Sequence, residues 1–145
     1  MAYWLFKSEP GAWSWDEQKA KAAEGEPWDG VRNHQANNNM KAMAVGDLGF
    51  FYHSVNEKQV VGVVEIIGAH RPDPTDASGR FGLVDVVAVC DMPEPVTLAA
   101  IKEEPALSEM ALVKQSRLSV TPVSGAEWAT ICRMGGLKPA PKSKA

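Results

Sequence analysis

Short runs of apolar, β-branched and aromatic residues recur along the chain, separated by polar segments rich in glycine, proline, asparagine and aspartate. This alternation is typical of strands joined by turns. It predicts a first strand that ends at Pro10-Gly11 and a hairpin whose polar loop surrounds Asn56-Glu57-Lys58. The predicted strands cover residues 3–7, 48–53, 59–67, 81–90 and 117–123.

Short helices are predicted between these strands. Ser14 and Glu17 have the capping-box spacing that begins a helix, and Ser124 caps an amphipathic helix that ends before two glycines. Residues 71–79 contain two prolines and are expected to form a loop. The predicted helices cover residues 14–23, 35–44, 97–104 and 124–134.

The order of the elements indicates the fold class. Strands and short helices alternate without the regular rhythm of a parallel sheet, which favours an α+β fold with a small, mostly antiparallel sheet or barrel and peripheral helices. A chain of 145 residues with 45% hydrophobic residues can bury a core as a single domain. We therefore expect one domain over residues 1–136 and a disordered basic tail over residues 137–145.

Charge restricts the way in which this chain can meet a polyanion. The net charge is −3, and the body without the three lysines of the tail has 12 basic side chains against 18 acidic ones. Its average field therefore disfavours nucleic acid, and any such contact must use local patches and a pocket. Two segments qualify, since residues 30–46 and 110–126 contain basic residues and no acid.

The sequence lacks clear metal, disulfide and membrane signals. Cys90 and Cys132 lie in apolar surroundings without further ligands at metal-binding spacing, so we expect buried thiols rather than a zinc site or a disulfide. The three histidines are far apart along the chain. The apolar stretch at residues 1–6 is too short for a signal peptide or a membrane span. We expect a cytoplasmic protein without a metal or other cofactor.

Residues 27–36 combine the side chains of a recognition loop. Trp28 offers a flat face for stacking, Asn33 and Gln35 carry paired donors and acceptors, and Arg32 suits a phosphate. This combination indicates nucleobase binding. A structural interpretation is open as well, in which Trp28 is a core anchor and the Asp29-Gly30 pair forms a tight turn.

Polar residues also end two of the predicted strands. Lys7-Ser8-Glu9 lies at the end of the first predicted strand, and Tyr52-His53-Ser54 ends the second, so both sets are placed to border one cavity with Trp28 and Asn33. The alternative is a solvated strand end with a weak Lys–Glu pair and a histidine that is merely hydrogen-bonded.

Six blocks of sequence, in this order, resemble the EVE domain family. The resemblance runs from residue 2 to about residue 134 and favours the recognition role of Trp28. It implies a PUA-like fold, a bent and mostly antiparallel β-barrel with short flanking helices, related to the YTH and ASCH domains. The blocks are YWLFKSEP (3–10), WDGVRNHQA (28–36), VGD (45–47), FYHS (51–54), PDPT (72–75) and RLSVTPV (117–123).

The resemblance implies a non-enzymatic module that accepts a modified base of DNA or RNA in a pocket, so the expected partner is a nucleic acid carrying such a base. Trp28 would stack on the base, Asn33 and Ser8 would contact polar base edges, and basic residues would meet phosphate or sugar. The implied ligand-binding residues are Lys7, Ser8, Glu9, Trp28, Val31, Arg32, Asn33, Tyr52, His53, Ser54, Arg117, Leu118 and Ser119.

Two departures and two alternatives accompany this resemblance. His34 stands where the family commonly has tyrosine, and the segment between Pro74 and Phe81 is shorter than the insert of many members.

One alternative is an ASCH-like hydrolase of a modified nucleoside, with Glu9 or His53 as general base and Lys7 holding the oxyanion. No nucleophile lies in a glycine-flanked elbow. The other alternative is a scaffold whose pocket binds a protein partner.

Overall fold

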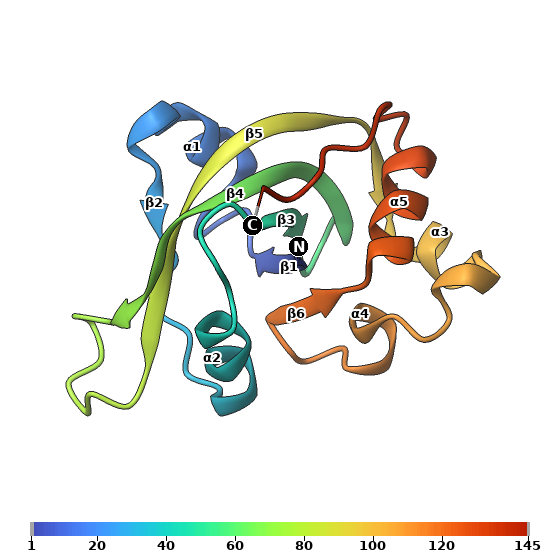
Figure 1. The fold of residues 1–145 in the computed structure, drawn as a ribbon. Coiled ribbons are helices and arrows are strands. Elements are labelled where there is room, and N and C mark those ends of the chain that lie inside the picture. The colour runs from blue at the N-terminus through green and yellow to red at the C-terminus, as the bar shows by residue number, and fades with distance from the viewer. Residues whose placement is uncertain (1, 145) are drawn as a thin grey trace.

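The computed structural model describes residues 2–144 of the chain. In this part of the chain, the strands form one bent sheet (Figure 1). In spatial order they are β2 (Glu26–Pro27), β5 (Gly82–Thr97), β4 (Gln59–Pro72), β3 (Leu48–His53), β1 (Tyr3–Ser8) and β6 (Val120–Val123). Neighbouring strands are antiparallel except β1 and β3, which run parallel.

The helices are short, and side chains cap most of their first turns. Ser14 forms the predicted capping box with Glu17, and Ser124, predicted as a cap, also forms a capping box with Glu127. Asn33 and Thr97 each accept a backbone N–H of the following helix. In chain order the helices are α1 (Trp15–Ala20), the 3-10 turn η1 (Ala22–Glu24), α2 (His34–Lys41), α3 (Leu98–Glu103), the 3-10 turn η2 (Pro105–Leu107), α4 (Ala111–Lys114) and α5 (Gly125–Met134).

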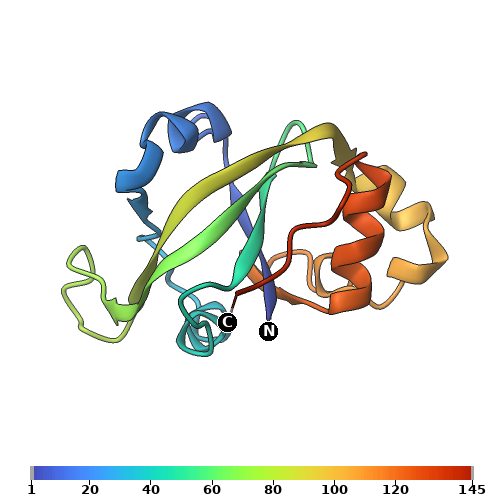
Figure 2. The same cartoon turned by 45° about the horizontal axis from the view of Figure 1, so that its top comes forward.

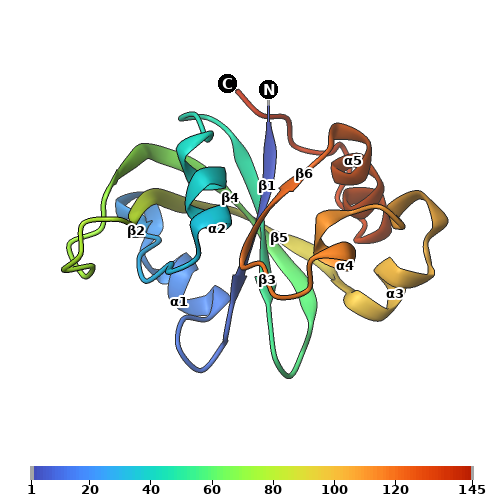
Figure 3. The same cartoon turned by 90° about the horizontal axis from the view of Figure 1, so that it is seen from below.

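Helices cover both faces of the sheet, so each strand buries side chains in two directions. Along β1, Tyr3 and Leu5 point into one core and Trp4 and Phe6 into the other, because successive side chains alternate. Helices α1 and α2 cover the face of Trp4 and Phe6, which we call the α1–α2 core. Helices α3, α4 and α5 cover the opposite face, the α3–α5 core (Figure 3).

Trp128 on α5 lies at the centre of the α3–α5 core. Its ring is near-parallel to the rings of Tyr3 and Phe50, with centroid separations of 4.5 and 4.0 Å. Its indole N–H donates to the Pro141 carbonyl at 2.8 Å, and the residue is 2% exposed. Trp128 is therefore packed against aromatic rings and satisfied at its polar edge.

The observed sheet confirms the predicted α+β class and its mostly antiparallel pairing. The sheet is open, with β2 and β6 as its two edges. Strands β4 and β5 are longer than predicted, because they continue through register shifts that bend the pair as it crosses the molecule (Figure 2). The last strand begins only at Val120. Strand β2, helix α4 and η2 were not predicted, since elements this short produce no periodic pattern.

The C-terminal segment packs against the body, so the prediction of a disordered tail is wrong for residues 138–144. This segment runs from α5 to the start of β1 (Figure 2). Ser143 is 5% exposed, its backbone N–H donates to the Tyr3 hydroxyl at 3.3 Å, and its hydroxyl donates to Asp47 Oδ1 at 3.2 Å. The composition of this segment gave no indication that its one serine, Ser143, fills a buried site. Ala145 lies outside the described residues.

Candidate functional site

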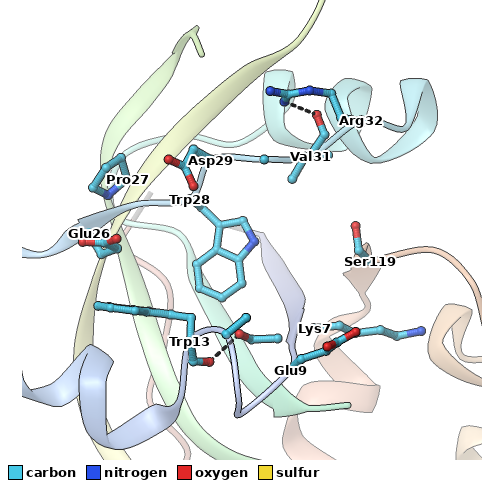
Figure 4. A pocket seen from close by; sticks show the side chains of 13 residues that line it. Lys7, Glu9, Trp13, Glu26, Pro27, Trp28, Asp29, Val31, Arg32 and Ser119 are labelled. Carbon is cyan, nitrogen blue, oxygen red and sulfur yellow. Dashed lines mark hydrogen bonds between the residues drawn. The ribbon is translucent and has the colours of Figure 1, made fainter. Parts of the chain in front are cut away.

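A cavity of about 430 Å³ lies where the end of β1 meets the segments before α1 and α2 (Figure 4). Ligand sites in proteins have volumes of about 300–1,000 Å³, so this space suits a single heterocycle. Its lining comes from the polar end of β1, the turn after it, the segment around β2 and the residue before β6. The lining residues are Lys7, Ser8, Glu9, Ala12, Trp13, Glu26, Pro27, Trp28, Asp29, Gly30, Val31, Arg32 and Ser119.

Trp28 forms one wall of the cavity. Its backbone N–H donates to the Val84 carbonyl at 2.7 Å, which ties this segment to β5. Its ring packs against Phe6 and Phe51 with centroid separations of 5.1 and 5.5 Å, both in edge-to-face geometry. The residue is 8% exposed. Trp28 is thus an anchor of the α1–α2 core, as the structural interpretation proposed, and the space beside its ring remains open.

Trp13 forms a second aromatic wall that the sequence analysis missed. Its indole N–H donates to Gln18 Oε1 at 2.9 Å, and the buried Gln18 donates to the Val86 carbonyl at 3.4 Å. Its own carbonyl accepts the Ser8 hydroxyl. Figure 4 shows the Trp13 ring edge-on and the Trp28 ring face-on. The two indoles therefore form a corner, in which a planar ligand that stacks on one ring turns its edge toward the other.

A buried carboxylate, Asp73, holds the loop that carries Trp28. Asp73 accepts the Gly30 N–H at 2.9 Å and the Arg32 guanidinium at 3.0 Å. Gly30 has a φ of +80°, which glycine adopts without strain. Burial acts to raise the pKa of Asp73, but hydrogen bonds from Thr75, Gly30 and Arg32 outweigh it and hold that pKa well below its ordinary value. Arg32, expected to meet phosphate, thus anchors the loop.

The polar end of β1 supplies charge to the other side of the cavity. The Lys7 ammonium donates to the Ser116 carbonyl at 2.7 Å and points away from Trp28 (Figure 4). Burial lowers the pKa of Lys7. The Lys7 backbone N–H donates to the Ser119 carbonyl at 2.9 Å, which joins β1 to the residue before β6. Glu9 is exposed at the cavity's edge.

The structure brings several of the predicted site residues together around the cavity and leaves others outside. Those that line it are Lys7, Ser8, Glu9, Trp28, Val31, Arg32 and Ser119. Those outside its lining are Asn33, Tyr52, His53, Ser54, Arg117 and Leu118. Lining residues that the sequence analysis did not select are Ala12, Trp13, Glu26, Pro27, Asp29 and Gly30. Of these, Trp13 carried the clearest signal, because a large aromatic follows a turn and precedes a helix cap there.

Local geometry explains why three of the predicted residues lie elsewhere. The Asn33 side-chain oxygen accepts the Ala36 N–H at 2.9 Å as the cap of α2. Strand alternation turns Tyr52 into the α3–α5 core, where burial raises its pKa to about 12. His53 lies beneath α1, where its Nε2 accepts the Trp15 backbone N–H at 3.0 Å.

Leu118 and Arg117 precede β6 and differ from each other in burial. Leu118 packs into the α1–α2 core, whereas Arg117 is exposed to solvent. Ser54 follows β3, and its backbone N–H donates to the Ser8 carbonyl at 2.9 Å. The structure therefore leaves only Ser119 of the predicted 117–119 set at the cavity.

Residues 2–144 contain no group of three or more His, Cys, Asp or Glu side chains that could hold a metal ion. Cys90 and Cys132 are free, and burial raises the pKa of both thiols. Within the same residues, no helix is both long and apolar enough to cross a membrane.

Comparisons with known proteins relate the chain to one family. The family model described as EVE domain matches residues 2–134. The thymocyte nuclear protein 1 of Gallus gallus is 31% identical over 169 aligned positions, which cover 94% of this chain and 70% of that protein.

Solved structures extend these relationships. A protein from Agrobacterium tumefaciens is 54% identical, with a TM-score of 0.97 over 100% of both chains. The crystal structure of human THYN1 protein in complex with 5-methylcytosine containing DNA is 30% identical, with a TM-score of 0.88 over 96% of this chain and 100% of that one.

Proposed function

The chain belongs to the EVE domain family, and from this premise we propose that it is a non-enzymatic reader that receives a modified base of DNA or RNA in the cavity beside Trp28. The human relative crystallised with DNA that contains 5-methylcytosine supports this ligand class. The proposal assigns the base to the corner formed by Trp13 and Trp28.

One observation carries this proposal: two indoles from separate segments meet at a single cavity of suitable volume. Stacking of a base on an aromatic side chain contributes about 1–3 kcal/mol. A base extruded from its strand into the corner would stack on one indole and direct its edge at the other. A methyl group on that edge adds apolar contact with the second ring, which favours the modified base over the plain one.

We assign the backbone contacts to the basic residues that remain accessible near the cavity. Arg117 is exposed in a segment that contains no acid, and Lys7 lies on the cavity side away from Trp28. Arg32 is paired with Asp73 and keeps a positional role. Because the whole chain has a net charge of −3, these local cations have to supply the attraction for phosphate.

The hydrolase alternative receives less support from the geometry. It required Glu9 or His53 as a general base near Lys7. His53 is outside the cavity lining, with Nδ1 2.9 Å from Glu57 Oε1 and Nε2 bonded to the Trp15 N–H. The Lys7 ammonium is directed at the Ser116 carbonyl. Of the two candidate bases only Glu9 lines the cavity, and the Lys7 ammonium is directed elsewhere, so no pair of groups converges on a reacting atom.

Binding titrations test the proposal. We expect wild-type protein to bind an oligonucleotide with one 5-methylcytosine more tightly than the same strand with cytosine. Trp28→Ala and Trp13→Ala should each weaken binding of the methylated strand by about five-fold to more than a hundred-fold, because each removes a stacking surface. Anisotropy at two salt concentrations separates pocket from backbone contributions.

The matched control is Trp15→Phe, which alters a tryptophan of the neighbouring helix that does not line this cavity. This variant should bind as the wild type does. Folded Trp13→Ala and Trp28→Ala variants with wild-type affinity would contradict the proposal. Chromatography of the oligonucleotides after incubation should recover them unchanged, whereas a converted nucleoside would favour the hydrolase.

A further inference from the structure

The five tryptophans differ in what their indole N–H groups contact. Four donate to protein acceptors: Trp4 to Asp47 at 3.0 Å, Trp13 to Gln18 at 2.9 Å, Trp15 to Asp91 at 2.7 Å and Trp128 to the Pro141 carbonyl at 2.8 Å. Within residues 2–144, no protein atom accepts the N–H of Trp28. Among the described residues, the fully buried side-chain polar atom without a partner is Thr121 Oγ1, so the Trp28 N–H is accessible to solvent or to a ligand rather than sealed in the core.

The position of Trp28 directs this donor into the cavity. The residue is more than nine-tenths buried. Its ring nitrogen points toward the space between Val31 and Ser119, and both of these residues line the cavity (Figure 4). The unpartnered donor therefore faces the volume that we assign to the ligand.

Polar groups beside the donor do not satisfy it. The Ser119 carbonyl already accepts the Lys7 backbone N–H at 2.9 Å, and Val31 has an apolar side chain. The Ser119 hydroxyl, like the Trp28 N–H, makes no hydrogen bond to residues 2–144. This side of the cavity thus presents two uncommitted polar groups.

We propose that the Trp28 indole N–H determines specificity by donating a hydrogen bond to an acceptor atom of the bound nucleotide, with the Ser119 hydroxyl as a neighbouring contact. This inference rests on the proposed function. Because the donor lies in the plane of the ring, the acceptor sits at the ring's edge rather than over its face. A base carbonyl, a base ring nitrogen and a phosphate oxygen are all acceptors that could fill this position. An amino group there would place two hydrogen-bond donors opposite each other and would be disfavoured.

A double-mutant cycle between protein and oligonucleotide tests the hydrogen bond. Trp28→Phe keeps an aromatic wall and lacks the N–H. The parent 5-methylcytosine strand is compared with strands that carry 3-deaza-5-methylcytosine, 2-thio-5-methylcytosine or neutral methylphosphonates beside the modified base. Wild-type protein should lose about ten-fold in affinity with one of these replacements. Trp28→Phe should bind the parent strand more weakly and be insensitive to that same replacement.

Trp13→Phe provides the matched control, because it also loses an indole N–H, but one that Gln18 accepts. It should retain the wild-type sensitivity to the replaced acceptor. The proposal is overturned when Trp28→Phe keeps that sensitivity in full, or when wild-type protein tolerates every replacement. The proposed function fails separately, when Trp13→Ala and Trp28→Ala leave binding of the parent strand unchanged.

Spectroscopy of the wild-type protein gives a readout that does not depend on a variant's affinity. An indole ¹H–¹⁵N spectrum reports each tryptophan, and Trp28→Phe identifies the Trp28 signal. Saturation with the 5-methylcytosine strand should move this signal downfield and slow its proton exchange, while the Trp128 signal stays in place. An unmoved Trp28 signal in the saturated complex overturns the inference. An absence of binding contradicts the proposed function itself for this base.

Discussion

Trp128 and Trp28 lie on opposite faces of one sheet, and they differ more in packing than in burial. Trp128 is 2% exposed, and its ring is inclined by only 16° to Phe50 and 20° to Tyr3. Trp28 is 8% exposed but meets Phe6 and Phe51 at 61° and 89°. Exposure alone therefore does not separate a core residue from a site residue. For these two residues, the ring geometry and the partner of the indole N–H make the distinction.

The two cores around these tryptophans also differ in how they are closed. In the α3–α5 core, Pro141 of the C-terminal segment accepts the Trp128 N–H and completes its surroundings. In the α1–α2 core, the loop with Gly30 is held by Asp73, and a cavity remains between this loop and the end of β1. The first arrangement favours stability, and the second preserves a binding space.

The largest expected effect is on stability. Trp128→Ala should lower the free energy of unfolding by about 3–5 kcal/mol, because it removes a large buried ring and leaves a cavity. Trp28→Ala should cost about 1–3 kcal/mol, since its ring already borders an open space. Urea unfolding at pH 7 measures both. A Trp28→Ala loss as large as that of Trp128→Ala would remove the distinction between the two residues.

Asp73→Asn should have the next largest effect and lower the free energy of unfolding by about 2–3 kcal/mol at pH 7. The substitution replaces a buried carboxylate, which accepts hydrogen bonds from several donors, with a neutral amide that accepts fewer and weaker ones. The pKa of Asp73 is lowered in the folded protein, so its contribution is present above the unfolded value and is lost as the pH falls toward the folded value. Below pH of about 4, wild-type stability should therefore decline more steeply than that of the variant. Urea midpoints between pH 3 and pH 7 that run parallel for the two proteins would contradict this.

The smallest expected effect concerns the backbone contacts. Arg117→Ala should weaken binding a few-fold for methylated and plain strands alike. It should also make the slope of the logarithm of the binding constant against the logarithm of the salt concentration shallower by about 1. Arg133→Ala, an exposed arginine on α5, is the control and should leave both unchanged. Should Arg117→Ala instead alter the preference for the methylated strand at constant salt dependence, Arg117 would be a base contact.

The parts of the fold that the sequence predicted depend on local signals. The capping box at Ser14 needed only residues three positions apart, and the cap at Ser124 needed only its place before an amphipathic run. The lining residues Lys7, Ser8 and Glu9 followed from the end of an apolar strand. Such features are set by neighbours along the chain, so pattern and composition suffice to find them.

The parts that the sequence did not predict depend on contacts between distant segments. Asp73 and Gly30 are 43 positions apart, and no local sequence pattern indicates that the Asp73 carboxylate holds the turn at Gly30. Tyr52 was expected to border the cavity together with its neighbour His53, but successive side chains of a strand point to opposite faces, and Tyr52 lies in the α3–α5 core. Asn33 was expected to contact a base, but its oxygen has the competing and shorter-range role of a helix cap.

The most direct test of the proposed binding mode is a structure of the protein bound to an oligonucleotide with one 5-methylcytosine. We expect the methylated base to leave its strand and lie in the corner of Trp13 and Trp28, with an acceptor atom beside the Trp28 nitrogen. A base bound elsewhere, for example in the separate groove lined by Trp15, Lys19 and Asp91, would contradict it.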